Sequence, residues 1–293
     1  MKVLITGASG LLGRALMDAF SEEDVLGLAY SRAAGNLKKL DITDPEAVNA
    51  CISEYKPEVI IHSAAVRTPD TCQNDPEYTY KMNVGATASV VESALKCGAW
   101  VLYISSDYVF DGTNPPYMAD DQTNPVNIYG KSKLEGEEVM RSQMPDGGIL
   151  RVPILYGPVK DLEECGITQL IKQVLSGESG IVEAWATRYP THVADVANVC
   201  FLLANAWCAN NKNVRLGGVF QFSGDEPVTK ADMAKIIGNI AKKDISQLKV
   251  DSSGPIGAPR PQDCHLDCSR LEELFELKRT PFEDGLSSII SKI

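Results

Sequence analysis

Tyr129 and Lys133 are the side chains with which this sequence could move a proton. They stand four residues apart, so on a helix both would lie on one face. A tyrosine with a pKa near 10 cannot exchange a proton efficiently at neutral pH unless its phenolate is stabilised. The Lys133 ammonium, together with the positive ring of an oxidised nicotinamide, could lower the tyrosine pKa by about three units. We therefore interpret the pair as an acid–base group with its supporting cation.

Ser106 is the third candidate for this chemistry, because it follows an apolar segment, residues 100–105, with the pattern of a buried parallel strand. The carboxyl ends of such strands form the ligand-binding edge of a sheet. The Ser106 hydroxyl could then hydrogen-bond a substrate carbonyl or hydroxyl beside Tyr129. Without such a function, Ser106 would only cap a strand and Lys133 would be a solvated helix residue.

A glycine-rich turn near the N-terminus predicts what the chain binds. The apolar residues 3–5 lead directly into TGASGLLG, residues 6–13, and then into an amphipathic segment. A strand, a glycine turn and a helix start in this order are typical of a pyrophosphate site. An ordinary βα turn is the alternative, and a phosphate-loop NTPase is excluded because no Gly-Lys-Ser/Thr follows. The expected cofactor contacts are Gly7, Ser9, Gly10, Leu11, Leu12 and Gly13.

The end of the second predicted strand, residues 25–30, favours NADP as the cofactor. An NAD enzyme usually places a carboxylate here to bind the ribose 2′-hydroxyl, whereas this chain has Tyr30, Ser31 and Arg32. A carboxylate would repel a 2′-phosphate, and the Arg32 guanidinium can pair with it. The alternative is a solvated loop arginine.

The composition restricts the class of protein. A chain of 293 residues suits one large α/β unit, or a core domain with a smaller partner domain. Its net charge of −11 argues against nucleic-acid and membrane partners, and an anionic substrate would need a locally basic pocket. No stretch reaches the roughly 18 apolar residues of a membrane span. Lys2 leaves no room for a signal peptide, so a cytoplasmic location is expected.

Cysteine and histidine offer little for a metal or disulfide framework. The eight cysteines are scattered without paired CxxC spacing, so they are interpreted as reduced thiols. The segment from Cys264 to Cys268 would need a second pair of ligands elsewhere to bind zinc. With only three histidines in the chain, no metal site is expected.

Strand-like and helix-like segments alternate through the first half of the chain. Strands are predicted at residues 25–30, 59–62, 100–105 and 149–152, and helices at 45–55, 76–97 and 129–141. This alternation predicts an α/β fold with a Rossmann-type, doubly wound parallel sheet. Residues 1–155 are expected to form an NADP-binding domain, with a returning segment near 187–210. Residues 156–293 would form a smaller, discontinuous C-terminal α/β domain for substrate or partner.

These motifs resemble the extended short-chain dehydrogenase/reductase family over essentially the whole chain. The glycine turn, the Ser-Ser-Asp strand end, the YxxxK helix and the Arg151-Val152-Pro153 strand occur in the family's order. The resemblance implies that Ser106, Tyr129 and Lys133 are the catalytic trio. It places Asn83 in a supporting role, Asp41 and Ile42 at the adenine, and Arg67 near the phosphates. Ser63, Ala64 and Ala65 would leave space for the cofactor, and Pro153 to Leu155 would flank the nicotinamide.

Within this family the chain is similar to the branch that contains dTDP-4-dehydrorhamnose reductase and the methionine adenosyltransferase beta subunit. Residues 104–117, 151–157, 189–200 and 266–272 carry the likeness. It implies an NADP-binding regulatory subunit that binds the methionine adenosyltransferase catalytic subunit and modulates S-adenosylmethionine synthesis. The alternative is an NADPH-dependent reductase of a nucleotide-linked 4-keto sugar. An NADP-sensing module with another partner is a third possibility. Ile154 replaces a tryptophan usual in the sugar reductases, and Tyr108 replaces the acid expected in a 4,6-dehydratase.

Overall fold

A seven-stranded parallel sheet forms the centre of the protein, as seen in a computed structural model that describes residues 1–209, 216–255 and 257–293. The strand order β3-β2-β1-β4-β5-β6-β10 begins with the order of a dinucleotide-binding fold. Neighbouring strands are parallel throughout the sheet. The predicted doubly wound α/β fold is therefore confirmed. Its strands are β1 (Lys2–Thr6), β2 (Asp24–Ala29), β3 (Lys38–Lys39), β4 (Val59–His62), β5 (Trp100–Ser106), β6 (Gly148–Val152) and β10 (Gly218–Gln221).

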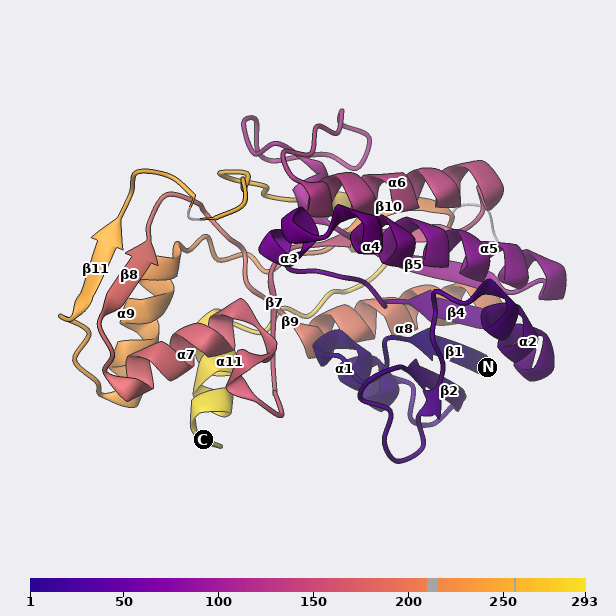
Figure 1. The fold of residues 1–293 in the computed structure, drawn as a ribbon, viewed down its shortest axis with the longest axis horizontal. Helices are drawn as coiled ribbons and strands as arrows, with labels where there is room; N and C mark the ends of the chain where they lie inside the picture. The colour runs from indigo at the N-terminus through magenta and orange to yellow at the C-terminus, as the bar shows by residue number, and fades with distance from the viewer. Residues whose placement is uncertain (210–215, 256) are drawn as a thin grey trace.

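Helices cover both faces of this sheet, and alternate strand residues divide between the two layers (Figure 1). In β1, Val3 and Ile5 pack with α1 and α8, whereas Leu4 packs on the opposite side with α2 and α5. Strands buried on both faces must be apolar at successive positions, which explains the continuous apolar runs in the sequence. The helices of these layers are α1 (Leu11–Ala19), α2 (Pro45–Tyr55), α5 (Ala86–Cys97), α6 (Ile128–Gln143) and α8 (Val193–Ala209).

The segment predicted as one helix over residues 76–97 is divided in the structure. It contains α4 (Pro76–Tyr80), a π-helical turn over Lys81–Gly85, and α5. Single π turns inside α-helices often occur at functional sites. Here the turn contains the buried Asn83, whose amide binds backbone and side-chain groups outside the helix.

The later half of the chain returns to the core twice. Helix α8 packs on α1, and the rings of Phe20 and Phe201 meet edge to face with their centroids 5.2 Å apart. The indole rings of Trp100 and Trp207 are stacked, also with a centroid separation of 5.2 Å. Strand β10 then pairs with β6 at the edge of the sheet. The sequence analysis did not predict a strand after Gly217, because the strand has only four residues, of which two are well buried.

A smaller body beside the sheet contains three helices and a two-stranded parallel sheet (Figure 1). The helices are α7 (Gly166–Ser176), α9 (Lys230–Ala241) and α11 (Phe282–Ile290), and the strands are β8 (Gly180–Glu183) and β11 (Leu248–Asp251). The short pair β7 (Leu155–Tyr156) and β9 (Thr191–His192) lies between the two bodies. The remaining helices are α3 (Pro69–Asn74) and α10 (Ser269–Glu272). In the described parts of the chain, no helix has the length and apolar character to cross a bilayer.

Gly13 allows α1 to pack against the glycine turn. A Cβ atom at Gly13 would lie 2.1 Å from the carbonyl oxygen of Gly7, which is backbone and cannot rotate away. We expect Gly13→Ala to destabilise the protein by at least about 2 kcal/mol, because an overpacked core must shift backbone. Urea unfolding followed by circular dichroism measures this difference.

Gly166→Ala is the matched control, since Gly166 opens α7 and nothing lies within 4 Å of the position that a Cβ atom would take there. This variant should be as stable as the wild type, or more stable by up to about 1 kcal/mol. Equal stability of the two variants would contradict the packing role of Gly13.

Candidate functional site

The glycine turn joins β1 to α1 with the geometry expected of an anion site. Gly7 has a φ of 69°, in the left-handed region that favours glycine, and its carbonyl accepts from the Gly10 amide at 2.9 Å. No side chain caps the N-terminus of α1, where Gly10 is the N-cap residue. The amides of the first helical turn and the helix dipole can therefore act on an anionic ligand.

Three arginines from different parts of the Rossmann-type core converge beside this turn. They are Arg14 in α1, Arg32 after β2 and Arg67 after β4, and all three donate to one residue, Glu164. The sequence analysis expected Arg32 to pair with a cofactor phosphate. In the structure its guanidinium donates to Glu164 Oε1 at 3.0 Å. Sequence reasoning missed Glu164, because 132 residues separate it from Arg32 and no local motif marks it.

The loop after β4 is held to the end of β1 by a buried histidine network. Thr6 Oγ1 lies 2.8 Å from His62 Nδ1 and accepts from the amides of Ser63 and Ala64 at 3.1 Å. Thr87 donates its hydroxyl hydrogen to a carbonyl, so His62 Nε2, 3.0 Å from Thr87 Oγ1, must be the donor of that pair. Burial lowers the pKa of His62 to about 3, which keeps the ring neutral.

Asn83 connects this loop to the helix that carries Tyr129 and Lys133. Its amide nitrogen donates to the Val66 carbonyl and to Ser132 Oγ, both at 2.9 Å, and its oxygen accepts from the Val66 amide at 2.8 Å. Both amide hydrogens are thus used by protein groups. The structure gives Asn83 a positioning role between the loop after β4 and α6.

Ser106 and Tyr129 come together at the carboxyl end of β5. The Ser106 side chain is near enough to act on the pKa of Tyr129, and the Tyr129 ring contacts Tyr108 edge-on, with centroids 5.9 Å apart. The expected lowering of the tyrosine pKa is not found here: burial of the hydroxyl raises the pKa of Tyr129 well above its ordinary value, although Ser106 opposes this. The phenol is therefore protonated at neutral pH.

Lys133, one turn of α6 after Tyr129, is buried. Its ammonium lies 4.0 Å from the centre of the Tyr103 ring. Burial lowers the pKa of Lys133 to about 7, while the nearby Glu137 carboxylate acts in the opposite direction. An amine that titrates near neutrality can exchange a proton under cellular conditions. Helix α6 thus carries both a protonated phenol and an amine that titrates near neutrality.

Asp107 is a buried acid at this site to which the sequence analysis gave no role. Its Oδ1 accepts from Ser106 Oγ at 2.9 Å, and burial raises the pKa of Asp107 to about 7. Ser106 also accepts from the Tyr108 amide at 3.2 Å. The Ser106 hydroxyl hydrogen therefore points to Asp107.

The other predicted contacts surround this edge of the sheet. Asp41 Oδ1 accepts from the amide and hydroxyl of Thr43 at 2.9 and 2.8 Å, and Ile42 is buried. Tyr30 and Ser31 are exposed beside Arg32. In the loop after β4, Ala65 is half-buried. Pro153, which follows β6, is buried, and Leu155 is half-buried. Their roles toward a cofactor stay predictions. Within the described residues, no group of three or more His, Cys, Asp or Glu side chains could hold a metal ion.

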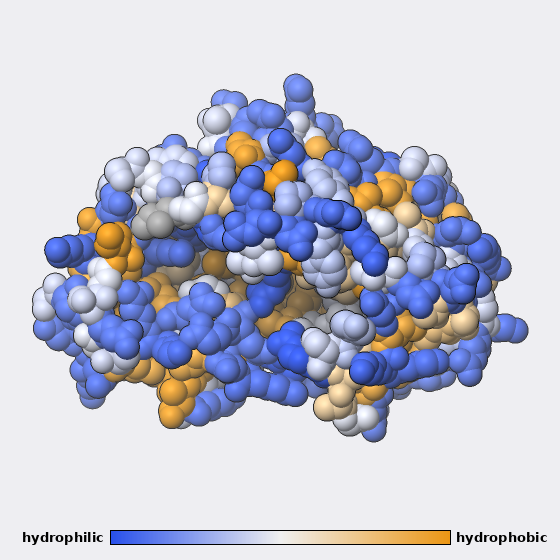
Figure 2. Space-filling view, viewed as in Figure 1, coloured by the Kyte–Doolittle hydropathy of each residue, from blue (hydrophilic) through white to orange (hydrophobic). Residues whose placement is uncertain are grey.

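The molecular surface is hollowed near the centre of the face shown in Figure 2, between the sheet body and the smaller body. Apolar surface is visible inside this hollow, and hydrophilic surface surrounds it. The hollow gives a ligand access to the region between the two bodies.

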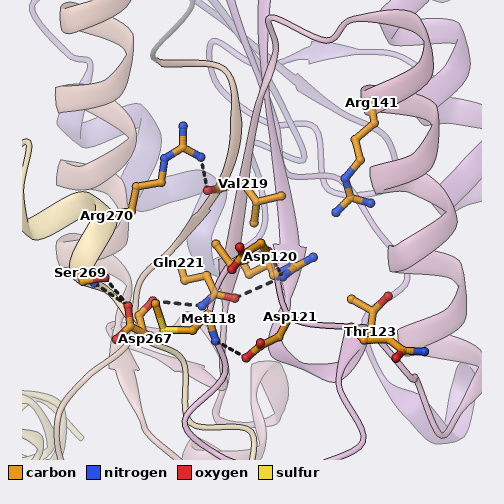
Figure 3. Close-up of a pocket in the computed structure, with 13 residues that line it drawn as sticks. Met118, Asp120, Asp121, Thr123, Arg141, Val219, Gln221, Asp267, Ser269 and Arg270 are labelled. Carbon is orange, nitrogen blue, oxygen red and sulfur yellow. Dashed lines mark hydrogen bonds between the residues drawn. The ribbon is translucent and has the colours of Figure 1, made fainter.

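A separate cavity of about 690 Å³ lies between the loop 118–123, α6 and α10 (Figure 3). None of its lining residues belongs to the predicted site. Two of the polar side chains that face it are paired: Gln221 Oε1 accepts from Arg151, and Asp267 accepts from Ser269. The glycine turn and the Tyr129 region remain the candidate site.

Comparison with known proteins places these features in a family. The RmlD substrate binding domain matches residues 1–293. Methionine adenosyltransferase 2 subunit beta of Mus musculus is 42% identical over 289 residues, which cover 97% of this chain and 86% of that protein. The dTDP-4-dehydrorhamnose reductase of Aggregatibacter actinomycetemcomitans is 29% identical over 304 residues, covering 98% of both. The predicted likeness to both groups is confirmed.

A solved structure agrees with the fold. The dTDP-4-dehydrorhamnose reductase of Bacillus anthracis, solved in complex with NADP, superposes with a TM-score of 0.84 at 27% identity. The superposition covers 100% of this chain and 99% of that one.

The buried Asp107 makes a testable prediction about stability and pH. Because its pKa is about 7 in the folded protein and near 3.8 when exposed, the folded state binds more protons between these values. The contribution of Asp107 should therefore lower the stability of the wild type relative to a variant without this acid as the pH rises from about 4 to 7, by up to about 4 kcal/mol. Asp107→Asn should lack this loss, being more stable than the wild type at pH 8 and equal to it at pH 4 in urea unfolding.

Asp18→Asn, on the exposed face of α1, removes the same charge and is the control. Its stability should follow the wild type at each pH. A wild-type and Asp107→Asn difference that does not change with pH would show that Asp107 does not titrate in this window.

Proposed function

The chain belongs to the RmlD substrate binding domain family, and from this we propose that it is an NADP-binding regulatory subunit of the methionine adenosyltransferase type. In this role it binds the catalytic subunit and modulates S-adenosylmethionine synthesis in the cytoplasm. One observation carries the proposal: the identity to methionine adenosyltransferase 2 subunit beta is 42% over 97% of the chain, against 29% to the sugar reductase.

The residues at the glycine turn fit NADP by their chemistry. The uncapped N-terminus of α1 offers amides to a pyrophosphate, and Arg14 and Arg32 bring two guanidinium groups to the same edge. No carboxylate follows β2 at positions 30–32, so nothing there selects a ribose 2′-hydroxyl. Lys133 and Tyr129 would approach the nicotinamide end, with Pro153 and Leu155 beside them.

A reductase acting on a nucleotide-linked 4-keto sugar is the second candidate, favoured by the position of Ser106 beside Tyr129 at the carboxyl end of β5. NADPH, when bound, supplies a hydride for such a reduction. The protonated Tyr129 hydroxyl would donate its proton to the carbonyl oxygen, and Ser106 would orient that oxygen. A protonated Lys133 would stabilise the phenolate that this transfer leaves on Tyr129. A regulatory protein can keep the same residues to hold NADP, so their presence alone does not distinguish the two functions.

The cofactor proposal predicts that NADP binds at least 10-fold more tightly than NAD in calorimetric titration. Arg32→Ala should weaken NADP binding about 10-fold, because it removes a charged partner of the 2′-phosphate at a half-exposed position, and it should change NAD binding little. Lys96→Ala removes an exposed cation from α5 and serves as the control. Tighter binding of NAD than of NADP by the wild type would contradict the proposal.

The partner proposal predicts that the purified chain forms a complex with a methionine adenosyltransferase catalytic subunit and changes its kinetics. Size-exclusion chromatography of the mixture and initial-rate assays of S-adenosylmethionine synthesis measure both effects. A lysozyme-sized inert protein at equal concentration controls for nonspecific effects.

Repeated absence of both effects would contradict the regulatory role. If NADPH were instead oxidised on addition of dTDP-4-dehydrorhamnose, and Tyr129→Phe abolished the oxidation, the reductase function would be supported.

A further inference from the structure

Glu164 connects the smaller body to the arginines beside the glycine turn. It ends a short 3-10 helix, Leu162–Glu164, just before α7. Arg14 Nη2 donates to its Oε2 at 2.7 Å and Nη1 to its Oε1 at 3.0 Å, while Arg32 Nη1 donates to the same Oε1 at 3.0 Å. Arg67 donates to its backbone carbonyl. One residue thus receives hydrogen bonds from all three arginines around the glycine turn.

The Glu164 carboxylate is a strong competitor for these cations. Its side chain is only 8% exposed, and it accepts from Arg14 through both oxygens, the geometry that makes guanidinium–carboxylate pairs strong. Burial alone would raise the pKa of Glu164, but the hydrogen bond from Arg14 and the charges of Arg14 and Arg32 bring it below its ordinary value. The side chain is therefore ionised at neutral pH.

The same contacts bind the whole segment 158–164 to α1. Arg14 Nη2 also donates to the Pro158 carbonyl at 3.2 Å, and the Lys160 amide donates to Glu164 Oε2 at 3.0 Å. The segment leads directly into α7 of the smaller body. If Arg14 or Arg32 changed its hydrogen-bond partner, the position of the segment that leads into α7 would therefore change.

We propose that Glu164 sets the selectivity between NADP and NAD, by competing with the 2′-phosphate of the dinucleotide for Arg32. This inference rests on the proposed NADP binding. A 2′-phosphate can take Arg32 only by displacing or weakening its bond to Glu164. NAD carries a neutral 2′-hydroxyl at that position and leaves the bond intact. Glu164 thus reduces the preference for NADP and couples phosphate binding to the position of segment 158–164.

Glu164→Gln tests the competition, because glutamine keeps the size and one acceptor oxygen but removes the charge. Glu163→Gln is the matched control: the neighbouring residue loses the same charge, but its partner is Lys172 at 2.6 Å and not one of the arginines. NADP and NAD are titrated calorimetrically into the wild type and both variants. The thermal midpoint of each protein is measured without cofactor and with saturating NADP.

We expect Glu164→Gln to bind NADP about 3- to 5-fold more tightly than the wild type, with less than a twofold change for NAD. Its midpoint without cofactor should fall, because the arginines lose their counter-charge, and NADP should raise the midpoint by more than in the wild type. Glu163→Gln should match the wild type in both affinities.

Three changes in affinity would overturn the inference, and so would the absence of any change. The first is weaker NADP binding by Glu164→Gln, which would make Glu164 a supporting contact. The second is an equal gain for NAD and NADP, and the third is an equal gain in Glu163→Gln. If NADP bound to none of the three proteins, the proposed cofactor would fail as well, whereas NADP binding to the wild type without an effect of Glu164→Gln would overturn only the role of Glu164.

Discussion

The buried carboxylate of Glu137 holds the parts of the site in place. It is fully buried in α6 and accepts from Ser105 Oγ at 2.5 Å, from Arg151 at 2.9 and 2.8 Å, and from Arg141 at 2.7 Å. These bonds join α6 to β5 and β6. Breaking such a pair leaves an uncompensated buried charge, which costs about 3–5 kcal/mol. Because α6 carries Tyr129 and Lys133, their positions relative to Ser106 depend on this interaction.

A second buried hydrogen-bond network connects α6 to the end of β1, where the glycine turn begins. Neutral His62 links Thr6 at the end of β1 to Thr87 in α5, and Asn83 links the loop after β4 to Ser132 in α6. Fully bonded polar networks of this kind favour one arrangement, since any displacement leaves buried groups without partners. The glycine turn, the loop after β4 and the tyrosine helix are therefore held in one arrangement at this edge of the sheet.

The arginine cluster is different in character, because it lies at the border of the two bodies and we propose that a ligand phosphate competes for it. Arg14, Arg32 and Arg67 meet Glu164 at the border of the two bodies, where Arg32 is still half-exposed. A net charge of −11 gives the protein a generally repulsive surface for an anionic cofactor. The three arginines beside the glycine turn make the local potential less negative there. The Glu164 carboxylate offsets part of their positive charge. The arrangement is compatible with both of the functions proposed above.

Local patterns in the sequence were enough to predict the Rossmann-type core and the candidate residues at its edge. Glycine spacing, apolar runs and the four-residue spacing of Tyr129 and Lys133 are such patterns, and local backbone geometry follows from them. The pKa of Tyr129, the titratable Asp107, the return of β10 to the sheet and the pairing of Arg32 with Glu164 emerged only from the folded chain. Burial and contacts between residues as far as 132 positions apart set these properties, and no local pattern records them.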